Sequence, residues 1–148
     1  MPGKRLMHYP STSLAVLMIM NNITYSDLIK IPDYGDRLRA LSLSGMHHDS
    51  PRYLSNSFYK SRVWMQLRDS IITRDIGCDL AVPGMFINGK IIVHHISPLT
   101  AEDIENQTSK CYDPDNLICV SEDTHNKIHY ASQFDTYIER KPGDTKLW

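Results

Sequence analysis

The sequence lacks the features that mark disulfide-stabilised and membrane-spanning proteins. It has three cysteines in 148 residues, and no two of them form a Cys-x-x-Cys pair. An odd number without such pairs argues against a disulfide framework and favours a reducing compartment, which we expect to be the cytoplasm. No apolar run reaches the ~18 residues that indicate a transmembrane helix, so we expect no membrane partner.

An excess of positive charge is also lacking. Sixteen Lys and Arg residues against 17 Asp and Glu residues give a formal net charge of −1. Because no overall positive field attracts nucleic acid, any site for a polyanion must be a local patch. Residues 52–74 are the most basic stretch and are either a solvated helix face or a surface that contacts phosphate. The cations of this stretch are Arg52, Lys60, Arg62, Arg68 and Arg74.

The N-terminal segment has only part of a signal-peptide pattern. Two cations precede the apolar run LAVLMIM (residues 14–20), but asparagines follow where a cleavage site needs small residues. We therefore expect a buried N-terminal segment, or a translation start further along at Met18 or Met20.

Helical patterns dominate the first half of the chain. The sequence predicts short helices over 24–31, with Thr24 as the N-cap, and over 33–44. A longer helix is predicted over 57–75, because apolar side chains recur there every four residues. These side chains are Tyr59, Val63, Leu67 and Ile71, with Trp64 beside them.

Extended patterns follow. Two β-rich runs within residues 85–96 are joined by Asn88-Gly89, a strong hairpin signal because a type I′ turn needs positive φ at both positions. The remaining pattern predicts an acidic polar loop over 97–114, a strand over 116–120 and a helix over 121–134 that is capped by Ser121. The fold class that we expect is therefore α+β.

These elements indicate one main domain with additions at both ends. We expect residues 1–54 to form a helical extension, in which residues 1–19 are disordered or loosely packed. Residues 55–135 would form the main domain, and residues 136–148 a tail.

Four of the seven histidines occur as two pairs in the second half of the chain. His94 and His95 are neighbours on a predicted strand, so their side chains leave opposite faces. His125 and His129 are four residues apart on a predicted helix and share one face, about 6 Å apart, which is close enough to chelate one metal ion. The zinc-protease motif is excluded, because Asn126 stands where that motif requires a glutamate.

The order of these motifs resembles the HNH nucleases, also called the ββα-metal or His-Me finger group, and in particular the small phage-encoded type. The spacing of nine residues between Asn116 and His125 is the common one in that family. The resemblance covers about residues 55–132 and implies a β-hairpin and a metal-bearing helix, preceded by N-terminal helices. The matching segments are HHISPL (94–99), NLI (116–118) and THNKIH (124–129).

The resemblance also implies a role for each motif residue. His95 matches the general base that takes a proton from the attacking water, and Asn116 matches the residue that orients this base. His94 and His125 match metal ligands, and His129 matches the additional ligand of the colicin-type DNases. Nitrogen ligands suit Zn²⁺ or Ni²⁺ and oxygen ligands suit Mg²⁺ or Mn²⁺, so one divalent ion of any of these kinds is expected.

The implied function is a metal-dependent endonuclease that hydrolyses phosphodiester bonds of double-stranded DNA in the cytoplasm of a phage-infected cell. The alternative is a catalytically degenerate HNH fold that binds DNA or a partner such as a phage packaging protein. The candidate phosphate contacts are Arg62, Arg68, Arg74 and Lys127.

One departure from the family concerns structural zinc. Many HNH proteins carry a zinc knuckle made of two Cys-x-x-Cys pairs. Cys78 stands at the first of these positions, but Ala81, Ser121 and Thr124 occupy the other three. We therefore expect no structural zinc, and we expect all three cysteines to be small buried side chains.

Overall fold

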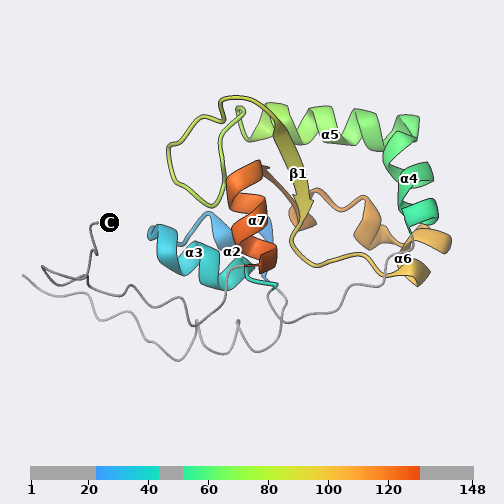
Figure 1. Cartoon of the computed structure of the whole chain (residues 1–148), viewed down its shortest axis with the longest axis horizontal. Helices are drawn as coiled ribbons and strands as arrows, with labels where there is room; N and C mark the ends of the chain where they lie inside the picture. Colours follow the sequence, from blue (N-terminus) through green and yellow to red (C-terminus); the bar gives the residue numbers. More distant parts are fainter. Residues whose placement is uncertain (1–22, 44–51, 131–148) are drawn as a thin grey trace, which may run out of the picture.

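The computed structural model describes residues 23–43 and 52–130. The predictions for residues 1–19 and 136–148 lie outside these ranges. The helices are α2 (Tyr25–Leu28), α3 (Tyr34–Leu41), α4 (Arg52–Lys60), α5 (Arg62–Arg74), α6 (Ala101–Glu105) and α7 (Glu122–Tyr130). The strands are β1 (Ile91–His95) and β2 (Leu117–Ser121), and the 3₁₀ turns are η1 (Ser109–Cys111) and η2 (Pro114–Asn116). The predicted α+β class is confirmed (Figure 1).

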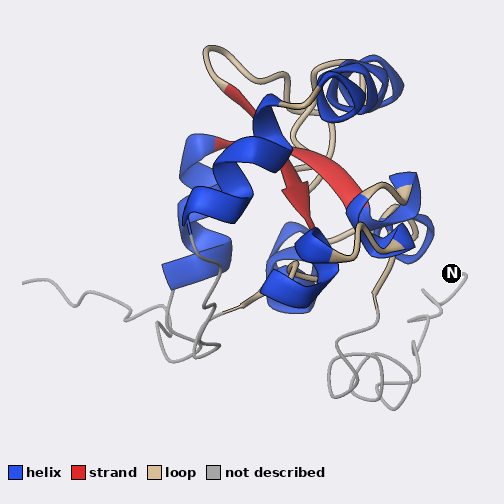
Figure 2. Ribbon diagram, turned by 90° about the vertical axis from the view of Figure 1, so that its right-hand side faces the viewer, coloured by secondary structure: helices blue, strands red, loops and turns tan. Residues whose placement is uncertain are grey.

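The two strands form an antiparallel sheet that is buried on both faces. The register pairs His94 with Ile118 and His95 with Leu117. Helices lie on either side of the strands (Figure 2), and two apolar clusters fill the space between helices and sheet. Successive side chains of a strand alternate between these clusters, so the neighbours His94 and His95 lie in different surroundings.

The first apolar cluster joins the N-terminal helices to β2 and α7. Leu28 of α2 and Leu41 of α3 pack there with Ile118 and Ile128. Thr24 forms a capping box with α2, which confirms the predicted N-cap. The buried Arg37 donates to the carbonyls of Ile29, Ile31 and Leu80 at 3.4, 2.6 and 2.6 Å. The helices of residues 23–43 therefore share their core with the sheet.

The second apolar cluster lies on the other face of the sheet, under α4, α5 and α6. Its members include Phe58, Trp64, Val93, Leu117 and Cys119. In Figure 1, α4 and α6 lie together at the opposite end of the molecule from α2 and α3. None of the described helices is long and apolar enough to cross a membrane.

The helix predicted over 57–75 is in fact two helices. The chain breaks at Ser61, whose hydroxyl accepts a hydrogen bond from the Trp64 amide at 3.2 Å and so caps α5. The break changes the direction of the axis, so the predicted stripe is wrong at Val63, which is 58% exposed, and at Tyr59, which is 41% exposed. Trp64 and Ile71 are buried as expected.

The hairpin predicted within residues 85–96 is also wrong. β1 pairs with β2, and of the two turn residues only Gly89 has positive φ, at 106°. The sequence before this turn forms no strand; Phe86 makes an isolated bridge with Cys78. Pairing with β2 places β1 between two apolar clusters, which buries more of its side chains than a local hairpin would.

Two further expectations need correction. The segment 97–114 is not only a loop, because Thr100 and Asp103 form a capping box that starts α6, and η1 follows. Cys111 and Cys119 are fully buried as expected, but Cys78 is only half-buried and its thiol points to the Ile76 carbonyl.

Candidate functional site

The three predicted metal ligands come together between β1 and α7. His94 leaves β1 on the face that α7 covers, and the ring centroid of His94 lies 5.4 Å from that of His125 and 5.3 Å from that of His129. The rings of His125 and His129 are 4.5 Å apart, as expected for successive turns of one helix. One nitrogen from each of the three residues lies within 4.8 Å of the others.

This arrangement fits the geometry that a divalent ion requires. Three imidazoles bound at the usual zinc distance have their nitrogens about 3.4 Å apart, so small side-chain rotations would close the set. His94 is buried, whereas His125 and His129 are half-buried, which leaves one side of the cluster open. Burial lowers the pKa of His125, the charge of Lys90 lowers it further, and Glu122 opposes both. The neutral imidazole that results is the form that binds metal.

His95 lies on the other face of β1, in the second apolar cluster. Its ring stacks on Trp64 with centroids 5.2 Å apart, and its Nε2 is 3.2 Å from the carbonyl oxygen of Cys111. A carbonyl can only accept, so Nε2 carries the proton and Nδ1 keeps its lone pair. The pKa of His95 is lowered to about 4, mainly by burial. The hydrogen bond to the Cys111 carbonyl raises this pKa, and the charge of Lys110 lowers it. His95 is therefore neutral at neutral pH.

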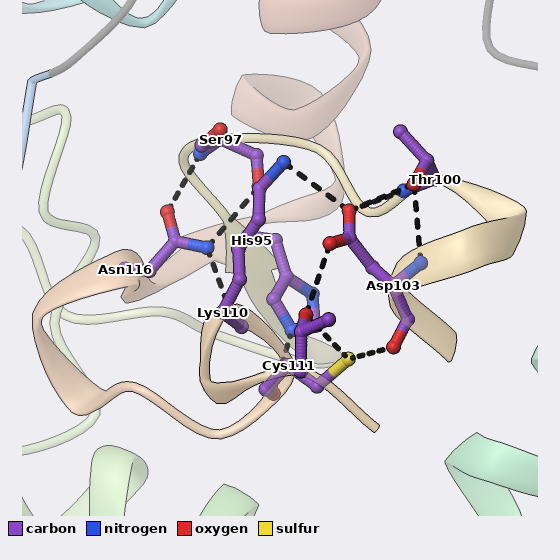
Figure 3. Close-up of polar contacts among 8 residues, drawn as sticks. His95, Ser97, Thr100, Asp103, Lys110, Cys111 and Asn116 are labelled. Carbon is purple, nitrogen blue, oxygen red and sulfur yellow. Dashed lines mark hydrogen bonds and ion pairs between the residues drawn. The ribbon is translucent and has the colours of Figure 1, made fainter. Parts of the chain in front are cut away.

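Asn116 holds the two segments that surround His95. Its side-chain oxygen accepts from the Ser97 amide at 2.7 Å, and its nitrogen donates to the carbonyls of Ser97 and Lys110 at 3.1 and 3.3 Å (Figure 3). Lys110 is the neighbour of Cys111, so this clamp fixes the carbonyl that Nε2 of His95 contacts. Such a position suits the orienting role predicted for Asn116.

Asp103 links Thr100, Thr108 and Lys110 in the segment that leads to Cys111. Asp103 was not identified from the sequence. Its carboxylate accepts from the Thr100 amide and from the hydroxyls of Thr100 and Thr108, all at 2.9 Å, and it lies 3.4 Å from the Lys110 ammonium. Its own carbonyl accepts from the Cys111 thiol at 3.1 Å. The spacing Thr-x-x-Asp is a capping-box signal that could have identified it.

We expect Asp103→Asn to destabilise the protein in a pH-dependent way. Hydrogen bonds, first that of the Thr100 amide, lower the pKa of Asp103 from 3.8 to about 2. A lowered folded-state pKa gives stability that is present above pH 4 and is lost as the pH falls towards 2; here it amounts to about 2 kcal/mol. Urea unfolding should show this difference at pH 7 and a smaller one at pH 3.

The exposed Asp69→Asn is the matched control and should cost little at either pH, since its side chain is 73% exposed. A loss of stability in Asp103→Asn that is the same at pH 7 and pH 3 would contradict the assigned cause.

The three-histidine cluster and His95 line one cleft of about 1120 Å³. The cleft runs along β1, and each of the five residues of the strand lines it. The three-histidine cluster lies on the α7 side, and His95 with Trp64 and Tyr59 lies on the α5 side. Side chains from opposite faces of a strand thus meet at a common opening.

The predicted phosphate contacts are not all at this cleft. Arg68 lines it, and Arg62 is exposed on the same helix. Lys127 is paired with Asp123 at 2.6 Å on α7. Lys90 also lines the cleft and was missed; its place directly before the apolar run of β1 was the available signal.

The Arg74 side chain is held by hydrogen bonds and an ion pair within the fold. Its guanidinium donates to the carbonyls of Pro114 and Leu117 at 2.7 and 2.6 Å and pairs with the buried Asp75 at 2.7 Å. It also lies 3.6 Å from the centre of the Tyr25 ring. These acceptors occupy its donors, which weighs against the predicted phosphate contact.

The site is thus defined by a cluster of three histidines, by His95 with the clamp around it and by two cations at the cleft. Its parts come from β1, α5, α7 and the loop that carries Cys111. Comparisons of the chain with models of protein families, with curated proteins and with solved structures found no match.

Proposed function

We propose that the protein is a metal-dependent DNA endonuclease of the HNH type, in which β1, β2 and α7 form the ββα-metal core. One observation carries the proposal. Three imidazoles spaced for one metal ion and a fourth, neutral imidazole oriented by a carbonyl line the same cleft from opposite faces of one strand. Both groups serve metal-assisted hydrolysis of a phosphodiester: the ion polarises the phosphate, and the neutral imidazole accepts a proton from the attacking water.

His95 acts as the general base. Its unprotonated Nδ1 accepts a proton from the water that attacks the phosphorus, while Nε2 keeps its hydrogen bond to the Cys111 carbonyl. That carbonyl stabilises the imidazolium as it forms. A phosphodiester bound in the cleft adds a negative charge, which also favours the protonated ring. Asn116 donates to the neighbouring carbonyl, that of Lys110, and so helps to hold the Cys111 carbonyl in place.

His94, His125 and His129 would hold the divalent ion, which when bound supplies positive charge to the phosphoryl oxygens and to the departing oxygen. Three neutral imidazoles leave that charge uncompensated, and the half-buried side of the cluster leaves room for substrate. The nitrogen donors favour Zn²⁺ or Ni²⁺ in affinity, although Mg²⁺ or Mn²⁺ can still support turnover.

Two cations at the cleft suit a polyanionic substrate. Arg68 lies on the α5 side, and Lys90 stands before β1, near enough to His125 to lower its pKa. They supply the local positive patch that a chain with a net charge of −1 needs for DNA. Double-stranded DNA is the proposed substrate, and the cytoplasm of a phage-infected cell is the proposed location.

A second candidate function is a degenerate HNH fold that binds DNA or a partner such as a phage packaging protein. The observation that favours it is the burial of His95, which is 6% exposed and has its pKa lowered to about 4. A base with so low a pKa takes up a proton less readily than an exposed histidine does.

Cleavage of supercoiled plasmid by metal-free protein tests the proposal, with Mg²⁺, Mn²⁺, Ni²⁺ or Zn²⁺ added back singly. We expect nicked or linear DNA only when a metal is present, with 5′-phosphate and 3′-hydroxyl ends. A folded protein that binds metal and DNA but cleaves with none of the four ions would contradict the enzyme and favour the binding module.

A further inference from the structure

A buried carboxylate joins the turn after α5 to the start of α7. Asp79 is 1% exposed. Its Oδ2 accepts from the amide and the hydroxyl of Ser121 at 3.1 and 2.8 Å, and from the hydroxyl of Thr124 at 2.6 Å. Its Oδ1 accepts from the Ala81 amide at 3.0 Å. Both oxygens of the carboxylate are therefore used, and three of the four bonds go to the junction between β2 and α7.

These bonds fall where they control the direction of α7. Ser121 directly precedes the helix, and its hydroxyl also accepts from the Thr124 amide at 3.2 Å, as an N-cap does. Thr124 is 2% exposed and directly precedes His125. Because the carboxylate contacts both Ser121 and Thr124 from another segment, it fixes the rotation of the helix about its axis as well as its starting point. Its negative charge also suits a helix N-terminus.

The turn that carries Asp79 is itself held against the sheet. The Leu80 amide donates to the Cys119 carbonyl of β2 at 2.9 Å, and the Leu80 carbonyl accepts from Arg37 at 2.6 Å. The Asp79 amide donates to the Met85 carbonyl at 2.9 Å. Asp79 is thus a fixed point relative to the sheet, and the same sheet carries His94.

We propose that Asp79 is a positioning residue for the three-histidine site. It sets the rotation of α7 at which His125 and His129 lie against His94. This inference rests on the proposed metal site and adds to it a residue that contacts none of the ligands directly.

The same turn offers a matched control. Asp75 is 6% exposed, and its carboxylate accepts from the Cys119 amide at 2.9 Å and pairs with Arg74. It binds to the middle of β2 and makes none of the bonds that Asp79 makes with Ser121 and Thr124. Both carboxylates are buried and both hold β2, but only Asp79 holds the start of α7.

The experiment compares Asp79→Asn, Thr124→Val and Asp75→Asn with the unaltered chain. Ni²⁺ affinity is measured by calorimetry, and amide hydrogen exchange of residues 122–130 is measured in the metal-free protein. In Asp79→Asn the side-chain NH₂ group faces a backbone amide that also donates, that of Ala81 or of Ser121, so a hydrogen bond is lost. We therefore expect Ni²⁺ affinity to fall on the order of 10-fold and amide exchange in α7 to rise. Thr124→Val removes one of the four bonds to the carboxylate, together with the 3.2 Å bond between the Ser121 and Thr124 hydroxyls, and should show the same changes at smaller size.

Asp75→Asn should lower overall stability and leave Ni²⁺ affinity unchanged. The proposal is overturned if Asp79→Asn and Thr124→Val bind Ni²⁺ like the unaltered chain, or if Asp75→Asn loses as much affinity as Asp79→Asn. If the unaltered chain binds no Ni²⁺, the proposed metal site fails, and exchange in α7 still decides the role of Asp79. Should Asp79→Asn not fold, Thr124→Val carries both measurements.

Discussion

His125→Ala is expected to remove metal binding almost completely. His125 lies at the half-buried side of the cluster, and without it two imidazoles from different elements remain. Changes in residues that merely support a ligand lower metal affinity by about 10- to 100-fold, so loss of a ligand should cost at least that much. Calorimetric titration with Zn²⁺ measures the loss directly.

A thermal-shift experiment gives an independent readout of the same change. A metal that binds only the folded state at 100 times its dissociation constant adds about 2.7 kcal/mol of stability. We expect Zn²⁺ to raise the melting temperature of the unaltered chain and of Lys127→Ala, a control on the same helix that does not line the cleft. His125→Ala should show no rise. An unchanged Zn²⁺ affinity in His125→Ala would exclude the three-histidine site.

His95→Ala is expected to lower the rate of DNA cleavage on the order of 1,000-fold, the usual contribution of a general base. Metal affinity should not change, because His95 lies on the face of β1 that is turned away from the cluster. The rate is measured at saturating DNA and metal, so that weaker binding does not enter. His95→Gln should be as inactive while keeping more of the packing on Trp64.

The control for this prediction is Tyr59→Phe, which alters the same wall of the cleft without removing a base. Its ring lies 6.3 Å from the ring of His95, and the substitution leaves that ring in place. We expect Tyr59→Phe to cleave at a rate close to that of the unaltered chain. Cleavage by His95→Ala at the unaltered rate would assign the base to another residue, and equal losses in both variants would indicate a structural cause.

The histidine cluster could be predicted from the sequence because it depends on local periodicity. The alternation of His94 and His95 and the four-residue spacing of His125 and His129 require only a strand and a helix. In the structure, the three predicted ligands lie close enough together to hold one metal ion. The HNH assignment and the catalytic roles stay predictions.

The errors in the fold arise where a distant partner decides. Asn88-Gly89 is a strong local turn signal, but β1 gains more by pairing with β2 between two apolar clusters. Ser61 reads as a neutral position inside a long helix, although its side chain also caps a new one. A pattern of apolar residues does not distinguish these outcomes.

The buried carboxylate of Asp79 was missed for a related reason. The donors that Asp79 meets at the start of α7 lie 42 to 45 residues along the chain, so no local pattern marks it. Its partners Ala81, Ser121 and Thr124 are the three positions at which the predicted HNH resemblance would place zinc-knuckle cysteines. The absence was visible in the sequence, but the carboxylate that links these segments was not.

The shared core of the N-terminal helices and α7 has a consequence for synthesis of the chain. Leu28 and Leu41 share their cluster with Ile118 and Ile128, and Ser26 bonds to Asp115, 89 residues later. At ~5–20 residues per second, a ribosome takes seconds to supply the second half of this core. During that time the first helices lack the part of their core that β2 and α7 supply. The three histidines can therefore come together only after α7 has been synthesised.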